Sequence, residues 1–169
     1  VFRELRDLVD ENARLTRPAR LVHWMFRNHL EAVAVGVRRV CDRRDDVISL
    51  SRLLRELLEY PEAVELLAGR HLNHEGWRPT ARSIRSDLRA VEDASMRVNR
   101  FVNKRVAHAA PLRELRRGPA ISDFAKTLAT LDAVATRYLL LVSGDGYRSC
   151  SPVPQSDWRQ VLREPWLAA

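Results

Sequence analysis

The sequence predicts an all-α protein: an up-and-down helical bundle of four to five helices with an irregular C-terminal tail from about residue 144. Apolar residues recur at spacings of three and four along most of the chain, which is the period of a helix packed on one side. The six glycines lie almost entirely between these periodic segments, and alternating apolar and polar residues never persist beyond a few positions. We expect residues 1–169 to form a single domain.

The first half of the chain predicts three helices. A short first helix is expected over residues 1–15. The second follows Pro18 and runs to about Arg43, with an inward stripe of Val22, Phe26, Leu30, Val33, Val37 and Val40. Ser49 is a good N-cap for a third helix, which Pro61 interrupts or ends before a polar connector over residues 69–79.

The second half predicts two long helices. The first begins near Thr80 and reaches about Ala107, with a stripe of Ile84, Leu88, Val91, Ser95, Val98, Val102 and Val106. Ser122 is expected to cap the second, which the glycines after residue 143 should end. Its predicted inward residues are Phe124, Leu128, Leu131, Val134, Tyr138 and Leu141.

Charge and cysteine content limit the possible partners. The chain has 29 basic and 22 acidic residues, a net charge of +7, which permits an anionic partner without demanding one. Two cysteines, Cys41 and Cys150, are too few for a disulfide framework and indicate reduced thiols in the cytoplasm. No apolar run approaches the roughly 20 residues of a membrane span, so no membrane partner is expected.

The segment from Arg97 to His108 carries the most chemistry. On an ideal helix Arg97, Lys104 and His108 project along one edge, with Arg100 beside them. These cations would attract a phosphate and favour a neutral imidazole, which accepts a proton near pH 7. The alternative is a histidine that only caps the end of its helix.

Two further groups of charged or metal-binding side chains have both a structural and a functional interpretation. The pairs Arg27–Glu31 and Arg38–Asp42 have the spacing of surface salt bridges, although Arg38 would be an anion ligand if the fold placed it beside His108. His71 and His74 resemble half of a metal site, but no fitting set of ligands completes it. We therefore expect no metal and no cofactor.

Several stretches resemble the HEPN superfamily, and most closely its abortive-infection branch, the AbiU-type group of bacterial proteins. The strongest is Asn103–His108, near the end of a long helix in an all-α bundle. Supporting stretches begin at His23, Ser49 and Asp157, so that the resemblance covers most of the chain and ends near Trp166.

The resemblance implies a cytoplasmic homodimer in which the motif helices meet, and a phage-defence or toxin role, with a cognate partner protein as a further possibility. It also implies metal-independent cleavage of RNA, in which a ribose 2′-hydroxyl attacks the adjacent phosphate. The site expected from it has His108, Asn103 and Arg105 as catalytic residues. Its RNA- or phosphate-binding residues are Arg38, Arg97, Arg100 and Lys104.

The motif departs from the family at one place. Active members carry an arginine that is separated from the histidine by four to six intervening residues. This chain has Phe101, Val102 and Asn103 at those positions. Asparagine orients a phosphate but supplies no charge. Two hypotheses follow: a metal-independent endoribonuclease, or a catalytically degenerate HEPN-like module that binds RNA, a nucleotide or a partner protein.

Overall fold

The computed structural model describes residues 19–72, 77–107 and 118–150, together with Glu4, Asp7 and Glu11. Every regular element in these residues is a helix, which confirms the predicted all-α bundle. The chain divides into two compact units: the larger is Val33–Ser151, and the other combines Val1–Ala32 with Pro152–Ala169. Whether residues 1–169 act as a single domain stays a prediction.

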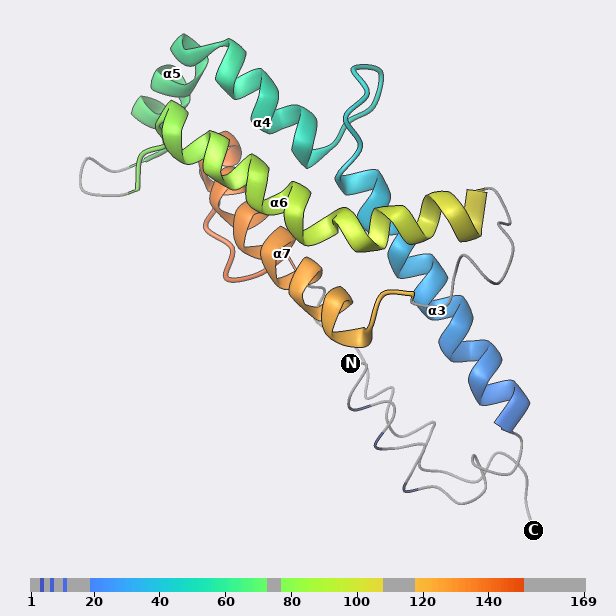
Figure 1. Ribbon diagram of the computed structural model, residues 1–169. Coiled ribbons are helices and arrows are strands. Elements are labelled where there is room, and N and C mark those ends of the chain that lie inside the picture. The colour runs from blue at the N-terminus through green and yellow to red at the C-terminus, as the bar shows by residue number, and fades with distance from the viewer. Residues whose placement is uncertain are drawn as a thin grey trace. The chain divides into compact units, whose positions relative to one another are not determined.

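Five α-helices and one π-helix make up the described chain (Figure 1). They are α3 (Ala19–Val40), α4 (Leu50–Glu59), α5 (Pro61–His71), α6 (Ala81–Phe101), η1 (Val102–Ala107) and α7 (Ile121–Ser143). The predicted first helix lies largely outside the described residues, and so does the tail with Trp158 and Trp166. None of the helices described is both long and apolar enough to span a membrane.

Most helix ends agree with the local signals in the sequence. Ser49 caps α4 by accepting a hydrogen bond from the backbone N–H of Arg52. Thr80 caps α6 in a reciprocal arrangement with Ser83. Gly144 ends α7 with φ of 77°, a left-handed conformation that favours glycine, and a Cβ there would lie 2.6 Å from Nδ1 of His71.

Two expectations about helix ends are corrected. Pro61 does more than interrupt α4, because it occupies the first position of α5, where its missing N–H costs nothing. Ser122 does not cap α7. The helix begins at Ile121, before Ser122, and Ala120 is its N-cap residue. The carboxylate of Asp123 accepts a hydrogen bond of 2.8 Å from the backbone N–H of Ala120.

The buried faces of α3 and α7 also differ in part from the predicted stripes. In the last turns of α3 the buried line is Ala34, Val37 and Cys41, whereas Val40 is 39% exposed. In α7, Leu128 is 40% exposed and Thr127 is fully buried in its place. The cause in α7 is a polar contact, because the Thr127 hydroxyl donates to the carbonyl oxygen of Ala94 on α6 at 2.6 Å.

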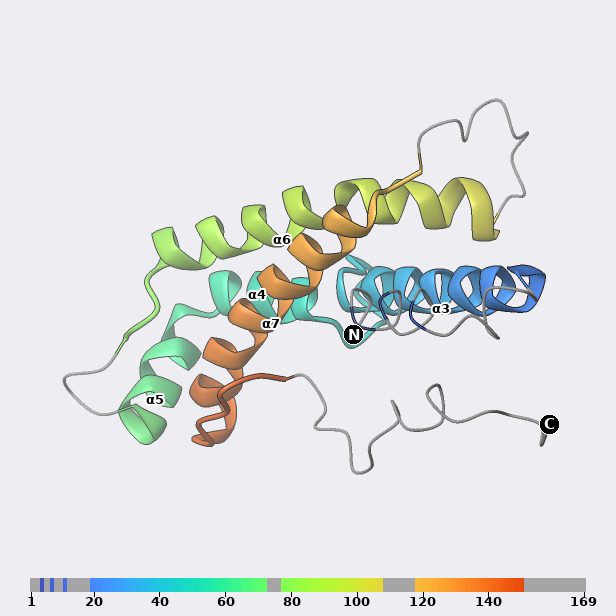
Figure 2. The same ribbon diagram turned by 90° about the horizontal axis from the view of Figure 1, so that it is seen from below.

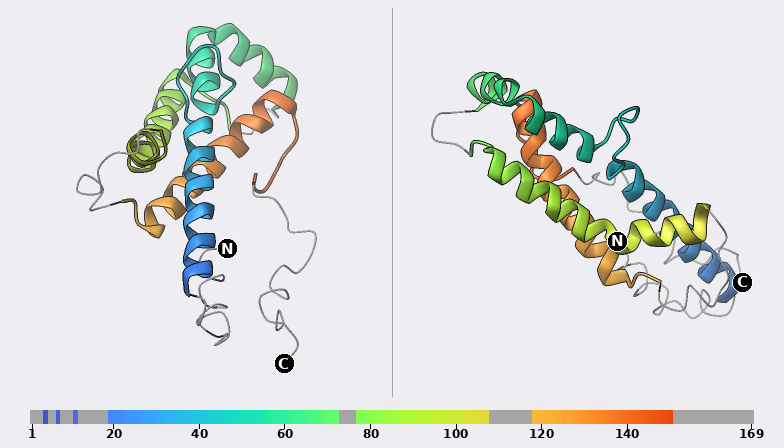
Figure 3. Two further views of the ribbon diagram at one scale, coloured as in Figure 1. Left: turned by 90° about the vertical axis from the view of Figure 1, so that its right-hand side faces the viewer. Right: turned by 45° about the horizontal axis from the view of Figure 1, so that its top comes forward.

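Within the larger unit, α6 packs against both α4 and α7, and α5 packs against α4 and α7 (Figures 2 and 3). The seam between α6 and α7 contains a buried carboxylate, Asp87. It accepts hydrogen bonds from the Tyr138 hydroxyl at 3.0 Å and from Arg137 at 2.8 Å. Trp77 meets the ring of Tyr138 edge to face. Because buried polar groups are costly when unpaired, this cluster fixes how the two helices face each other.

Replacing Tyr138 by phenylalanine should therefore destabilise the fold. Burial and the neighbouring Asp87 carboxylate hold the pKa of Tyr138 above its ordinary value, so its hydroxyl is a permanent donor. Tyr138→Phe leaves Asp87 short of one donor, and we expect a loss of about 1–2 kcal/mol in the free energy of unfolding, measured with urea. The exposed Tyr147 provides a matched control, Tyr147→Phe. Equal stabilities of the two variants would contradict the role given to the Asp87 cluster.

Candidate functional site

A pocket of about 750 Å³ lies between the end of α3, the connection to α4, the first turn of α4, and one face of α6 and η1. We call it the basic pocket, because five cations and three carboxylates line it. The cations are Arg38, Arg43, Arg44, Arg100 and Lys104. The carboxylates are Asp42, Glu92 and Asp93.

Four of the predicted site residues come together in this pocket. Arg38 from α3, Arg100 from α6, and Asn103 and Lys104 from η1 all line it. The expectation for Arg38 depended on its lying beside His108. Arg38 shares the pocket with Asn103 and Lys104, but His108 lies outside the described residues, so its position beside Arg38 stays a prediction.

The other predicted residues are placed differently. Arg97 turns to the neighbouring helix, where its Nη1 lies 3.2 Å from the Asp123 carboxylate, and it does not line the basic pocket. Arg105 is half-buried in η1 and is also not a lining residue. His108 lies outside the described residues, which end with Ala107 at the close of η1.

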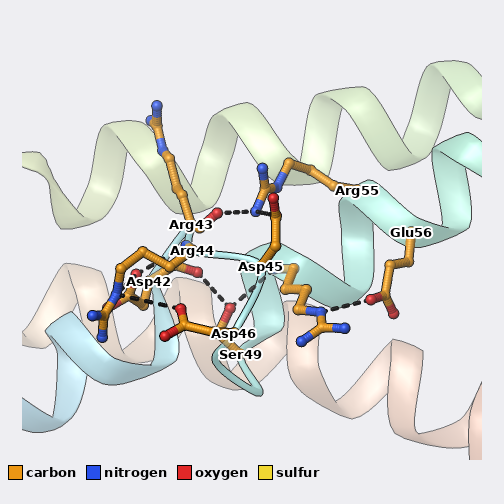
Figure 4. A network of polar contacts seen from close by, with 9 residues as sticks. Asp42, Arg43, Arg44, Asp45, Asp46, Ser49, Arg55 and Glu56 are labelled. Carbon is orange, nitrogen blue, oxygen red and sulfur yellow. Dashed lines mark hydrogen bonds and ion pairs between the residues drawn. The ribbon is translucent and has the colours of Figure 1, made fainter.

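The connection between α3 and α4 forms one wall of the pocket, and Figure 4 shows how its polar groups hold it. The Asp42 carboxylate accepts a 3.0 Å hydrogen bond from the backbone N–H of Arg44 and a longer one from that arginine's Nε. The backbone bond and the Arg44 guanidinium lower the pKa of Asp42 below its ordinary value. The Ser49 hydroxyl donates to the carbonyl oxygen of Asp42 and so joins this turn to the cap of α4.

Two further contacts tie the same wall to the helices. Nη2 of Arg43 lies 2.9 Å from the Glu92 carboxylate on α6. Arg55 of α4 donates to the carbonyl oxygen of Arg43 and pairs with Asp45 at 3.3 Å. The wall is therefore held from α4 and from α6.

The predicted salt bridges have different outcomes. Arg27 and Glu31 form theirs, with Nε and Oε1 3.0 Å apart. The expected pair between Arg38 and Asp42 does not form. Asp42 is held by Arg44, which follows it by two residues and reaches it through both backbone and side chain.

These pairings leave positive charge in the pocket. Asp42 and Glu92 are each matched by an arginine of the wall. Arg38 and Arg100 make no ion pair with a carboxylate of the described residues. Ser51, the second residue of α4, lines the pocket, so the positive end of that helix dipole lies there too. The arrangement is suited to an anion such as a phosphate.

The motif segment has an unusual backbone. Val102–Ala107 form a π-helix, a rare conformation that is frequent at functional sites because the wider turn re-aims its side chains. The sequence analysis expected an ordinary helix through these residues and did not identify this break.

Sequence reasoning did not identify the other lining residues as part of a site. Among them are Arg43, Arg44, Ser51 and Asn99. The one available signal was that Asn99 precedes Asn103 by a single helical turn. The loop residues carried no signal, because their place in the pocket depends on tertiary contacts.

The described residues hold no metal centre. No group of three or more histidine, cysteine, aspartate or glutamate side chains within them is arranged to bind an ion. His71 is half-buried at the end of α5, against Gly144, while His74 lies outside the described residues.

The two thiols should react at very different rates. Cys41 lines the pocket but is only 6% exposed, and burial raises the pKa of its thiol. Cys150 is exposed. We expect an aromatic disulfide reagent at pH 7.5 to label one thiol quickly in the native protein and the second only after denaturation. Cys150→Ser should remove the fast phase, and two fast thiols in the native protein would contradict the burial of Cys41.

Comparison of the chain with family models, with curated proteins and with solved structures finds no match.

Proposed function

We propose that this protein binds RNA in the basic pocket and cleaves the bound strand without a metal ion. The observation that supports binding is the convergence of Arg38, Arg100 and Lys104 from three different elements on one pocket. Guanidinium groups bind phosphate oxygens through paired, charge-assisted hydrogen bonds, and a lysine adds a point charge. The charge left after the wall arginines are paired favours a polyanion over a neutral ligand.

The cleavage step rests on the resemblance to the HEPN superfamily and on His108, the residue directly after η1. In the proposed reaction a ribose 2′-oxygen attacks the adjacent phosphorus and the bond to the 5′-oxygen breaks. The imidazole of His108 removes the proton of the 2′-hydroxyl, and the departing 5′-oxygen takes up a proton from water. The products are a 2′,3′-cyclic phosphate and a 5′-hydroxyl. The pocket arginines offset the charge that builds on the phosphorane.

One observation favours the second candidate, a module that binds RNA without cleaving it. The positions that hold the motif arginine in active members are Phe101, Val102 and Asn103, and the first two are apolar side chains that are half-buried and buried. A buried valine and a half-buried phenylalanine supply no charge to a phosphorane. Arg100 lines the pocket and is the nearest substitute in the chain.

The resemblance extends the proposal to the assembly and its role. We infer a homodimer whose motif helices meet, acting in bacterial defence against phage or as a toxin, with a cognate partner protein as a further binding partner. In such a homodimer the RNA-binding surface of one copy would lie beside the second copy of the chain.

RNA affinity should depend on the two pocket arginines. We expect Arg38→Ala and Arg100→Ala each to weaken the binding of a fluorescently labelled single-stranded RNA by about tenfold, measured by anisotropy. Each should also reduce the slope of log affinity against log salt by about 0.7, because one phosphate contact is lost. Arg89→Ala is the matched control, since Arg89 is an exposed arginine of α6 outside the pocket. Equal losses in all three variants would indicate general charge attraction instead of a site.

Cleavage should survive removal of divalent metal ions. We expect the purified protein to cut RNA in EDTA and His108→Ala to abolish the products while leaving RNA affinity nearly unchanged. Gel analysis of the fragments, with a test for cyclic phosphate ends, measures both rate and chemistry. Binding with no cutting by the parent protein would favour the non-catalytic module, and undiminished cutting by the variant would remove His108 from the mechanism.

A further inference from the structure

Two buried polar atoms on the wall of the basic pocket have no hydrogen-bond partner among the described residues. They are the hydroxyl oxygen of Ser51 and the side-chain carbonyl oxygen of Asn99. Ser51 is only 1% exposed. A buried polar atom without a partner costs about 1–3 kcal/mol, so a pair of them lining one pocket requires an explanation.

The two serines nearest in sequence to these residues have hydrogen-bonded hydroxyls, which Ser51 lacks. The Ser49 hydroxyl donates to Asp42 and caps α4. The Ser95 hydroxyl accepts from Nδ2 of Asn99 at 3.1 Å and donates to the carbonyl oxygen of Glu92. The bond to Ser95 holds the amide of Asn99 in place, with its oxygen left as an acceptor.

The chemistry of the Asn99 amide oxygen excludes a phosphate as its partner. An amide oxygen accepts hydrogen bonds and donates none, and a phosphate oxygen at neutral pH is also an acceptor. Asn99 therefore requires an N–H or O–H donor, and Ser51 suits either a donor or an acceptor. A nucleoside offers such groups on its base edges and ribose hydroxyls, next to the phosphate that the cations would hold.

We propose that Ser51 and Asn99 form a nucleoside subsite, which hydrogen-bonds the sugar or base attached to the phosphate held by Arg38, Arg100 and Lys104. This inference rests on the proposed binding of RNA in the same pocket. A volume of about 750 Å³ lies within the ordinary range of small-ligand sites. The pocket would then recognise one whole nucleotide unit of an RNA chain.

The test is displacement of a labelled single-stranded RNA by small competitors. The probes are AMP, UMP, ribose 5-phosphate and inorganic phosphate, each titrated at constant ionic strength. We expect the nucleotides to displace the RNA at concentrations about tenfold lower than inorganic phosphate, because they add hydrogen bonds to the phosphate contact. Ribose 5-phosphate shows whether the ribose or the base supplies the donor. If the ribose is bound, it should displace RNA at the same concentration as the nucleotides. If the base is bound, it should displace RNA only at the concentration that inorganic phosphate requires.

Ser51→Ala is the decisive variant. It should abolish the preference for nucleotides over phosphate while leaving the melting temperature unchanged or higher, because it removes a buried hydroxyl that has no partner. Ser83→Ala is the matched control: its hydroxyl has partners at the start of α6 and it does not line the pocket, so the melting temperature should fall and the preference should remain. If Ser51 had only a structural role, Ser51→Ala would lower the melting temperature and leave the preference for nucleotides intact.

The outcomes separate this inference from the function on which it rests. Equal displacement by nucleotides and inorganic phosphate, or a preference that survives Ser51→Ala, would overturn the nucleoside subsite while RNA binding stands. Failure of the parent protein to bind RNA at all would overturn the proposed function and the subsite together.

Discussion

The rotation of α6 about its own axis is the constraint on which the rest of the larger unit depends. It is set by polar contacts along the seam with α7, where Asp87 bonds Tyr138 and the Thr127 hydroxyl bonds the backbone of Ala94. Since a helix is stiff over this length, contacts in its first and middle turns determine which residues face the opposite side. The α6 residues on that opposite side line the basic pocket, so the hydrogen bonds of the seam orient the pocket face of α6, which includes Asn99 and Arg100.

Ion pairs between arginines and carboxylates fix the side chains of the pocket wall. Asp42 and Glu92 hold arginines that would otherwise be mobile, and the Ser49 hydroxyl joins the turn to the start of α4. Exposed ion pairs contribute little to stability, but they restrict where long side chains point. The ion pairs of the wall therefore add little to the free energy of unfolding, but they give the wall a defined shape. A binding site depends on such fixed geometry more than on added stability.

Features determined by neighbouring residues were predictable from the sequence, and those determined by distant contacts were not. Ser49, Thr80 and Gly144 act at the helix ends where local rules place them. The exchange of Leu128 for Thr127 in the core depends on a carbonyl 33 positions away in the sequence. The site divides in the same way. Arg100 and Lys104 could be chosen from the sequence as cations of the motif segment, but ideal helical spacing wrongly put Arg97 on one edge with Lys104. The wall arginines, the π-helix and the pairing of Arg97 with Asp123 required the packed structure.

Binding and catalysis make different demands on this pocket. Ground-state attraction of a phosphate needs positive charge anywhere in reach, and Arg38 from α3 supplies it as well as a motif arginine would. In the reaction we propose, acceleration of cleavage needs charge aimed at the oxygens of the phosphorane. The lack of an arginine at positions 101–103, where the resemblance implies one, therefore bears on the rate much more than on the affinity. The proposed function therefore allows a large loss of cleavage rate with little loss of RNA affinity.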